Sequence, residues 1–459
     1  MTRPPNAPPP GEGDSNRSPA RERFHVGLDP ATRALVDEDA HWFLHQSLSS
    51  PCLSAVARAE GIWIEDLAGR RYMDFHGNNV HHIGYGHPRL IAALKAQLET
   101  LPFAPRRFTN EVVVALARKL TAIAPKGLNK LLLAPGGSEA IEMALKLARA
   151  VTGRHKFLSF WDSFHGAGFG GASVGGGALF RSGPVGPLLA GTEHVAPFAC
   201  YRCPYGYPDR EGAPQLDLCH MRCAEFVRYV LAKEQDVAAV IAEPVRAVPY
   251  LPPPGFWQEV RRACDDHGTL LIFDEIPTGL GKTGRMFACE HFGAEPDILV
   301  LGKALGGGVL PVAALLAKPE FDILGDYAIG HYTHEKNPVL ARAALTTIEI
   351  IENEDLVTRA AKVGKAALER LQELRDRHSL IGDVRGLGLV IGIELVRDRR
   401  TKEPATEEAD AVLYACLERG LSFKTTFGNT LTLTPPLTVT EVEMDRALDI
   451  IDAALTEVT

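Results

Sequence analysis

Apolar residues recur along the chain in two different patterns, and the change of pattern marks its organisation. Between about residues 126 and 317, short aliphatic runs alternate with amphipathic stretches. Runs that are apolar almost without interruption are typical of strands buried on both faces of a parallel sheet. We expect four such strands, at LLLA (131–134), VAAVIAE (237–243), TLLIFDE (269–275) and DILVLGK (297–303).

Helices are predicted between these strands. In SEAIEMALKLARAVTG, apolar residues follow the i, i+3, i+4, i+7 spacing from Ile141, and Gly153 ends the pattern. A second helix is expected over 255–268, after a PPPG segment. Strands that alternate with helices predict an α/β domain with a mostly parallel sheet flanked by helices.

After about residue 340 the apolar stretches become longer and are spaced as in amphipathic helices. Thr440 and Glu443 have the spacing of a capping box at the start of the last one. The pattern predicts a smaller α+β domain. Its expected elements are helices over 338–352 and 356–378, a strand at 389–395, and helices around 407–419 and 440–457.

The expected organisation therefore has four parts. Residues 1–24 hold six prolines among polar residues and are expected to form a disordered tail, because they cannot bury apolar area. Residues 25–90 are expected to pack with the small domain, residues 91–337 to form the large domain, and residues 338–459 to form the small C-terminal domain.

Composition excludes several classes of protein. Of 459 residues, 46% are hydrophobic and 23% charged, which is typical of a globular protein. The net charge of -8 gives no basic surface for nucleic acid or an anionic membrane. No apolar run is long enough to span a bilayer, and the N-terminus has no apolar signal core, so we expect a cytoplasmic protein.

Four of the eight cysteines lie close together in the sequence. Cys200, Cys203, Cys219 and Cys223 have the spacing C-x2-C, fifteen residues, C-x3-C, which is compatible with a structural zinc site. The alternative is a surface excursion with free thiols. We favour the alternative and expect no metal, because the second pair enters a predicted helix and a chain of this length needs no metal for stability.

Three local patterns indicate one cofactor. The turn APGGSEA (134–140) opens a helix with glycines and Ser138, which suits a bound phosphate, although helix packing alone could require it. Asp274 and Glu275 end one predicted strand, and Lys303 ends the next. The alternative for Asp274 and Glu275 is a solvated acidic loop. The alternative for Lys303 is a side chain that reaches solvent. Pyridoxal 5'-phosphate (PLP) needs an anion site, a carboxylate for its ring nitrogen and a lysine for its aldehyde.

Residues from about 26 to 459 resemble the class III aminotransferase family of PLP enzymes, fold type I. The resemblance implies a large domain with a mostly parallel seven-stranded sheet, a smaller α+β C-terminal domain, and a homodimer with shared active sites. It also implies a small-molecule amine as the substrate. The matching segments, in the order of the family, are GGSEA, WDSFHGA, IAEPV, FDEIPTGLGKTG, LGKALGGG, THEKNP and GNTLTLTPPL.

The resemblance assigns the catalytic residues. It implies that Lys303 forms the Schiff base with the cofactor and that Asp274 pairs with the ring nitrogen. Phe164 would stack on the ring. Once released from the cofactor, Lys303 would be placed to remove a proton from the substrate.

Further cofactor contacts follow from the same resemblance. Gly137 and Ser138 would bind the phosphate, and Thr333 would reach the phosphate held by the neighbouring subunit. His165 and Glu243 lie in matching segments and are assigned supporting roles in cofactor binding.

Three positions depart from the family pattern. Pro277 replaces a Gln that contacts the ring hydroxyl of the cofactor. Thr432 stands where 2-oxoglutarate transaminases carry an Arg that clamps the substrate carboxylate, and Val248 replaces the Glu that often neutralises this Arg. An ordinary 2-oxoglutarate transaminase is therefore disfavoured.

Cations and histidines gather instead in other segments that line the pocket in this family. We expect Arg107, Arg246 and Lys336 to bind a substrate with a phosphonate or phosphate group, although each alone suits a surface role. Within the family, the chain is most similar to the (R)-1-hydroxy-2-aminoethylphosphonate ammonia-lyases. The other residues of this kind are His76, His81, His82 and Arg106, and Glu335 precedes Lys336 where the family has small residues.

Two enzymatic hypotheses follow. The first is a lyase that eliminates ammonia from a β-hydroxy amino-phosphonate. The alternative is a transaminase that moves an amino group from an ω-amine or amino acid to pyruvate, glyoxylate or another oxoacid. A non-enzymatic PLP-fold module is disfavoured because Lys303, Asp274 and the phosphate site are all present.

Overall fold

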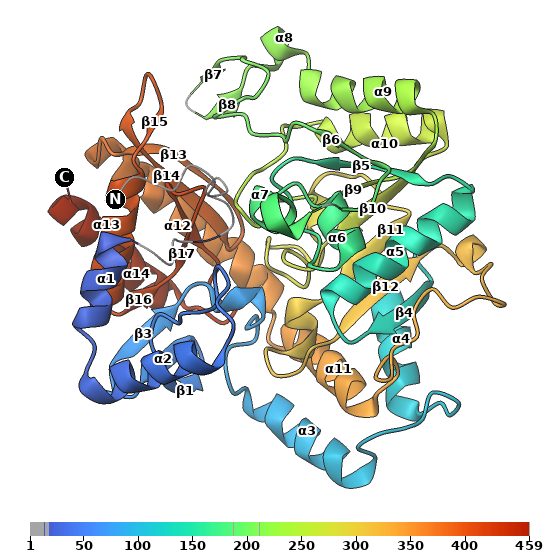
Figure 1. Cartoon of the computed structure of the whole chain (residues 1–459), viewed down its shortest axis with the longest axis horizontal. Helices are drawn as coiled ribbons and strands as arrows, with labels where there is room; N and C mark the ends of the chain where they lie inside the picture. Colours follow the sequence, from blue (N-terminus) through green and yellow to red (C-terminus); the bar gives the residue numbers. More distant parts are fainter. Residues whose placement is uncertain (1–12, 14–17, 187, 211, 459) are drawn as a thin grey trace.

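The computed structural model describes residues 13, 18–186, 188–210 and 212–458. A seven-stranded sheet forms the centre of the large domain (Figure 1). Six strands run parallel, and only β12 is antiparallel to its neighbours. In sheet order the strands are β4 (Lys130–Ala134), β12 (Ala313–Ala317), β11 (Ile298–Leu301), β10 (Leu270–Asp274), β9 (Val237–Ala242), β5 (Lys156–Phe160) and β6 (Thr192–Val195).

Both faces of this sheet are buried, as the uninterrupted apolar runs predicted. Ile272 of β10 packs in one core with α5 (Gly137–Thr152), whereas Phe273 packs in the other core. On that second face, the ring of Trp257 from α10 (Phe256–His267) lies 4.8 Å from the ring of Phe273. The sequence-based prediction of a mostly parallel α/β domain is confirmed.

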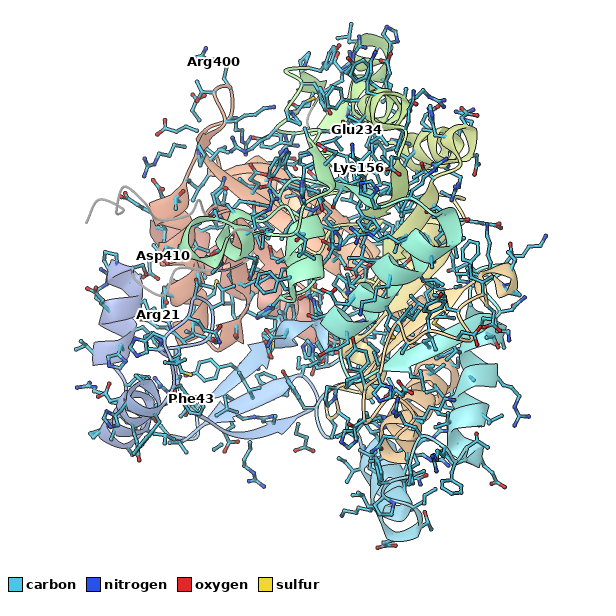
Figure 2. The ribbon with its side chains drawn as sticks, turned by 45° about the vertical axis from the view of Figure 1, so that its right-hand side comes forward. Arg21, Phe43, Lys156, Glu234, Arg400 and Asp410 are labelled. Atoms are coloured by element: carbon cyan, nitrogen blue, oxygen red, sulfur yellow. The ribbon has the colours of Figure 1, made fainter. Side chains whose placement is uncertain are left out.

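Helix α9 (Arg222–Glu234) packs beside α10. Figure 2 labels Lys156 at the start of β5 and Glu234 at the end of α9, and an ion pair joins them. The shorter elements of the large domain are α6 (Phe169–Val174), α7 (Ala178–Arg181), α8 (Leu216–Cys219), β7 (Asp209–Arg210) and β8 (Ala213–Pro214).

A second, antiparallel sheet organises the C-terminal region. Glu443 N–H donates to Thr440 Oγ1 over 3.2 Å and Thr440 N–H donates to Glu443 Oε2 over 2.9 Å, so the predicted capping box is present. The strands are β13 (Ile381–Leu387), β14 (Val390–Asp398), β18 (Thr430–Leu433) and β17 (Lys424–Thr426), with β15 (Glu403–Pro404) beside β14, and the helices are α12 (Leu356–Arg377), α13 (Thr406–Glu418) and α14 (Glu441–Val458).

The N-terminal segment joins this C-terminal region through a third sheet. Its strands β1 (Val56–Glu60), β2 (Trp63–Asp66) and β3 (Arg71–Asp74) are antiparallel, and β3 pairs in parallel with β16 (Leu421–Ser422). Figure 1 shows these blue strands beside the red C-terminal helices.

The expected boundary of the disordered tail at residue 24 is wrong. Residues 1–12 and 14–17 lie outside the described part of the chain, but α1 (Pro19–Val26) already begins at Pro19. Ser18 caps this helix by accepting a hydrogen bond from Arg21 N–H at 3.0 Å. The Phe24 ring is buried 5.7 Å from the ring of Tyr414, so tertiary packing stabilises a helix that its polar sequence does not predict. Helix α2 (Pro30–Trp42) follows.

The long helix α11 (Pro338–Asn353) packs against the large domain as well as α12. Its neighbours are α3 (Pro88–Thr100), α4 (Glu111–Ile123) and the 3-10 turn η4 (Lys303–Gly306). Across the described residues, no helix combines the length and apolar character needed to cross a membrane.

Candidate active site

Lys303 lies two residues after the end of β11, at the first residue of η4. Its backbone φ is +43°, in the left-handed region that non-glycine residues rarely adopt. Such a conformation persists where surrounding structure fixes it, and α11 packs against this turn. The side chain is half-buried and lines a cavity.

Asp274 and His165 form a buried pair at the end of β10. His165 Nδ1 lies 2.8 Å from Asp274 Oδ2, and both side chains are almost inaccessible to solvent. Ile276 N–H donates to the other carboxylate oxygen at 3.1 Å. The carboxylate is therefore fixed in position by two hydrogen bonds. His165 thus lies against the carboxylate of Asp274 rather than in solvent.

The neighbouring Glu275 serves a different purpose. Its carboxylate accepts hydrogen bonds from Ala288 N–H at 2.6 Å and Cys289 N–H at 2.8 Å. Complete burial raises the pKa of Glu275 to about 7. Because it anchors a loop, Glu275 leaves Asp274 as the carboxylate available at this strand end.

The predicted phosphate site forms at the N-terminus of α5. Gly137 and Ser138 are its first two residues, where backbone N–H groups have no partner within the helix. Ala167 N–H donates to Ser138 Oγ at 3.2 Å, so the SFHG loop lies against this end of the helix. Gly166 permits that approach: its φ is +114°, and a Cβ there would lie 2.7 Å from Ser138 Oγ.

Phe164 and Glu243 flank this region. The Phe164 ring lies 4.5 Å from the ring of Phe180, centre to centre. Glu243 is buried after β9 and accepts a hydrogen bond from Ala247 N–H at 2.9 Å. The hydrogen bond shapes the turn that follows β9. The roles of Phe164 and Glu243 in cofactor binding stay predictions.

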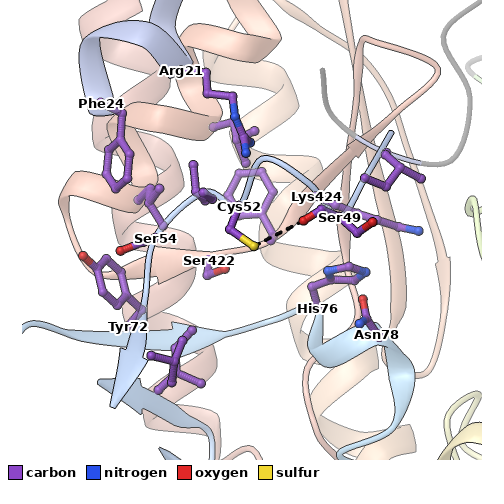
Figure 3. Close-up of a pocket in the computed structure, with 18 of the residues that line it drawn as sticks. Arg21, Phe24, Ser49, Cys52, Ser54, Tyr72, His76, Asn78, Ser422 and Lys424 are labelled. Carbon is purple, nitrogen blue, oxygen red and sulfur yellow. Dashed lines mark hydrogen bonds between the residues drawn. The ribbon is translucent and has the colours of Figure 1, made fainter. Parts of the chain in front are cut away.

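A cavity of about 540 Å³ opens beside Lys303, between the N-terminal segment and the C-terminal region (Figure 3). Its lining includes Lys424, His76 and Asn78, together with Arg21 of α1. Figure 3 labels these four side chains around one space. The sequence singled out only His76 among them, because strand pairing and the fold of the N-terminal segment bring the others here.

The histidines of FHGNNVHH differ in their surroundings. Burial, followed by the charge of Lys424, lowers the pKa of His76 to about 3, although the nearby Asp74 opposes the shift. His81 and His82 are fully buried, with Nε2 atoms 2.9 Å from Asp74 O and 3.2 Å from Gly279 O. Only His76 of the three lines the cavity.

Within one chain, none of the three cations predicted to bind substrate lines this cavity. Arg107 and Lys336 are exposed on two loops that contact each other through Asn110 Nδ2 and Lys336 O, 3.5 Å apart. Thr333 is exposed on the second of these loops. Arg106 bonds to the His331 ring on this loop, with nitrogens 2.6 and 2.8 Å apart.

Arg246 is buried instead of exposed. Its guanidinium carbon lies 5.4 Å from the centre of the Tyr250 ring, in a cation–π contact. None of its three guanidinium nitrogens makes a hydrogen bond within the described residues. Its role in substrate binding stays a prediction, because it lies outside the lining of the cavity beside Lys303.

The three positions that depart from the family pattern are all buried. Thr432 Oγ1 lies 2.9 Å from Thr426 Oγ1 on the neighbouring strand β17, so a hydroxyl pair occupies the place of the carboxylate clamp. Val248 and Pro277 are also buried. These positions therefore offer no side-chain cation to a substrate carboxylate.

The four clustered cysteines line a second, smaller cavity with Tyr205. Burial raises the pKa of the Cys200 and Cys223 thiols to about 12. Where the chain is described, no group of three or more His, Cys, Asp or Glu side chains could hold a metal ion. The assignment of free thiols stays a prediction.

Comparisons with known proteins identify relatives over most of the chain. The model of the class III aminotransferase family matches residues 45–455. An (R)-1-hydroxy-2-aminoethylphosphonate ammonia-lyase of Vibrio splendidus (strain 12B01) is 45% identical over 456 residues, 97% of this chain and 95% of that protein. A leucine/methionine racemase of Thermococcus litoralis is 38% identical, over 89% of this chain and 91% of that protein.

A solved structure extends the comparison to the fold. An amine transaminase from an uncultivated Pseudomonas species, in its PLP-bound form, superposes with a TM-score of 0.84. It is 33% identical, and the match covers 91% of this chain and 99% of that one. The chain belongs to the class III aminotransferase family.

Proposed function

We propose that the protein is a PLP-dependent ammonia-lyase that acts on a β-hydroxy amino-phosphonate. The reaction would convert 1-hydroxy-2-aminoethylphosphonate to phosphonoacetaldehyde and ammonia, with no net gain or loss of electrons. The observation that carries the proposal is the replacement of the carboxylate clamp by the buried Thr432 and Val248. Similarity over 97% of the chain to a lyase of this kind from Vibrio splendidus supports it.

The described residues fit the cofactor. The first turn of α5 offers backbone N–H groups to a phosphate, and Gly137 keeps the space beside Ile276 open, since a Cβ there would lie 2.9 Å from Ile276 Cδ1 and displace it. Asp274 supplies a fixed, buried carboxylate for a protonated ring nitrogen. Lys303 follows the adjacent strand β11 and supplies the amine.

The chemistry divides between the cofactor and the chain. When bound, PLP supplies an aldehyde that takes up the substrate amine and a ring that accepts its electrons. Asp274 keeps the ring nitrogen protonated, and His165 donates from Nδ1 to hold the carboxylate in place. Lys303, once displaced by the substrate amine, removes a proton from the carbon that bears the nitrogen and can return it to the departing hydroxyl.

The remaining assignments belong to the same proposal. The protein acts as a homodimer, and Thr333 of one subunit reaches the phosphate site of the other. Its exposure on the loop before α11 supports this assignment. Arg107 and Lys336, on adjoining exposed loops, would then lie at the interface. Arg246 supplies a further buried positive charge.

The decisive experiment omits any amino acceptor. Purified protein, loaded with PLP, is incubated with 1-hydroxy-2-aminoethylphosphonate alone, and ammonia and phosphonoacetaldehyde are measured over many turnovers. Equal, continuing release of both is expected. The matched control is 2-aminoethylphosphonate, which lacks the leaving hydroxyl and should release no ammonia.

The same assay separates the lyase from a transaminase. Pyruvate is added, and alanine is measured beside ammonia. Absence of ammonia from the hydroxylated substrate, combined with steady formation of alanine, would refute the lyase and establish the alternative.

A further inference from the structure

We propose that Lys424 binds the phosphonate group of the substrate, with His76 and Asn78 beside it in the same cavity. The inference rests on the proposed function and adds the residue that recognises the anionic end of the substrate. The sequence did not single out Lys424, and the comparisons assign it no role.

Lys424 and Lys303 line one cavity, and both lower the pKa of His76, so both lie near this side chain. The cavity, of about 540 Å³, lies within the range typical of small-molecule sites. A substrate held at its amino end by the cofactor on Lys303 would extend its phosphonate into the space that Lys424 lines. Arg107, Arg246 and Lys336 line no part of it.

The charged groups of the cavity favour a dianion. Its described lining contains Lys303, Lys424 and Arg21, against one carboxylate, Asp66. Both oxygens of Asp66 already accept hydrogen bonds, from groups that include the Arg70 guanidinium at 2.8 Å. Among the described lining residues, three cations therefore face one carboxylate, and a doubly charged phosphonate would be attracted more strongly than a carboxylate.

Strand register explains how Lys424 reaches this position. In the antiparallel ladder of β17 and β18, Lys424 is the direct partner of Thr432. Directly opposed residues point to the same face of a sheet. The position of the lost clamp and Lys424 therefore share one face, and Lys424 is 8% exposed. An ammonium is a compact charge with three donors, which suits a tetrahedral phosphonate without requiring the planar geometry of a carboxylate–guanidinium pair.

His76 reports on the charge of the cavity. Burial lowers its pKa most, Lys424 comes next, and His81 and Lys303 act in the same direction, whereas Asp74 raises it. A bound dianion would offset the field of the two lysines. The pKa of His76 should therefore rise when the site is filled.

The test compares Lys424→Met with Lys424→Arg in the PLP-loaded enzyme. Lys365→Met, which makes the same change at a surface position of α12, is the control. Two substrates are used: 1-hydroxy-2-aminoethylphosphonate and 2-aminoethanol, which keeps the amine and the hydroxyl but has no phosphonate. The kcat/KM ratio between them is expected to fall about 10–100-fold in Lys424→Met, mainly through KM, because a charge-assisted contact is lost. Lys424→Arg should recover part of this kcat/KM ratio, and Lys365→Met should keep the ratio of the wild-type protein.

A binding measurement keeps the inference independent of turnover. Methylphosphonate is titrated into the wild-type and Lys424→Met proteins while the His76 ring is followed by NMR. Tighter binding to wild type, with a rise in the pKa of His76, supports the inference even if no ammonia is released. Equal methylphosphonate affinities, or an unchanged substrate ratio in Lys424→Met, would overturn it. Failure of ammonia release alone would overturn only the lyase reaction.

Discussion

At the scale of single residues, the proposed chemistry depends on Lys303, which has a backbone conformation that lysine rarely adopts. The left-handed backbone at Lys303 turns the chain directly after β11. A strained residue of this kind costs on the order of 1–3 kcal/mol, and the surrounding packing must supply that energy. Such strain is found where a side chain has to be aimed, and here it aims the only covalent contact proposed for the cofactor.

Removing this side chain should abolish turnover and leave the fold intact. In Lys303→Ala, kcat is expected to fall by at least about 10³-fold, because the covalent contact and the proton-transferring base are lost together. The far-ultraviolet circular dichroism should match the wild type, and the visible absorbance of the lysine–cofactor linkage should disappear. Lys362→Ala, an exposed change on α12, is the control. Wild-type kcat in Lys303→Ala would show that another group performs these steps.

The sequence predicted some site residues better than others, and the reason is physical. Asp274 ends β10 and Lys303 follows the adjacent parallel strand β11, so the strand pattern alone brings them to one edge of the sheet. Lys424 reaches the cavity through the β17–β18 pairing and the fold of the N-terminal segment, which depend on contacts far apart in the chain. Arg246 was predicted near substrate, but its burial beneath Tyr250 could not be predicted from spacing.

At the scale of elements, long periodic segments were predicted to within a few residues. Helix α12 covers Leu356–Arg377 where 356–378 was expected, and α10 covers Phe256–His267 where 255–268 was expected. Both have strong apolar periodicity. Helix α1 was missed because it has only eight residues and depends on the Ser18 cap and on burial of Phe24. Short elements of this kind are stabilised by tertiary contacts, not by propensity.

The loop after β10 contains a buried lysine, Lys282, that we expect to make stability depend on pH. Lys282 is fully buried, and its Nζ donates to Pro435 O at 2.7 Å, which ties the loop to the end of β18. Burial lowers the pKa of Lys282 to about 7, with Asp74 opposing. Between pH 7 and the ordinary lysine pKa of about 10.4, the unfolded chain therefore binds the extra proton, and the free energy of unfolding should rise with pH.

Lys282→Met should remove that contribution. The slope of unfolding free energy against pH between 7.5 and 9.5 is expected to fall by about 1.4 kcal/mol per pH unit relative to wild type. Urea unfolding at several pH values measures this slope. Lys95→Met, at an exposed position of α3, should keep the wild-type slope. Identical slopes for Lys282→Met and wild type would mean that Lys282 stays charged in the folded protein.

At the scale of the whole molecule, the site is assembled from parts that are distant in sequence. The large domain provides Lys303 and Asp274, and the N-terminal segment and C-terminal region enclose the cavity beside Lys303. The pairing of β3 with β16 holds these two regions together. Because α11 also packs against η4, the C-terminal half supports the turn at Lys303 as well as one wall of the cavity.

The proposed exchange of Thr333 between subunits makes a prediction about mixed dimers. Thr333 is exposed on a loop that contacts the loop before α4. Arg106 bonds to His331 across the two loops, and the rings of Phe103 and His334 lie 5.5 Å apart. In Thr333→Asp, a carboxylate would repel the phosphate in the partner's site, so this variant and Lys303→Ala should each be inactive.

A dimer of one Thr333→Asp chain and one Lys303→Ala chain contains one site with both defects and one site with neither. Random mixing of the subunits should therefore restore about a quarter of wild-type activity, because half of the dimers are mixed and each has one intact site. Subunits are mixed under conditions that allow exchange, dimerisation is followed by size-exclusion chromatography with light scattering, and ammonia release is measured. If the mixed dimers form and remain inactive, Thr333 acts within its own subunit and the shared site is refuted.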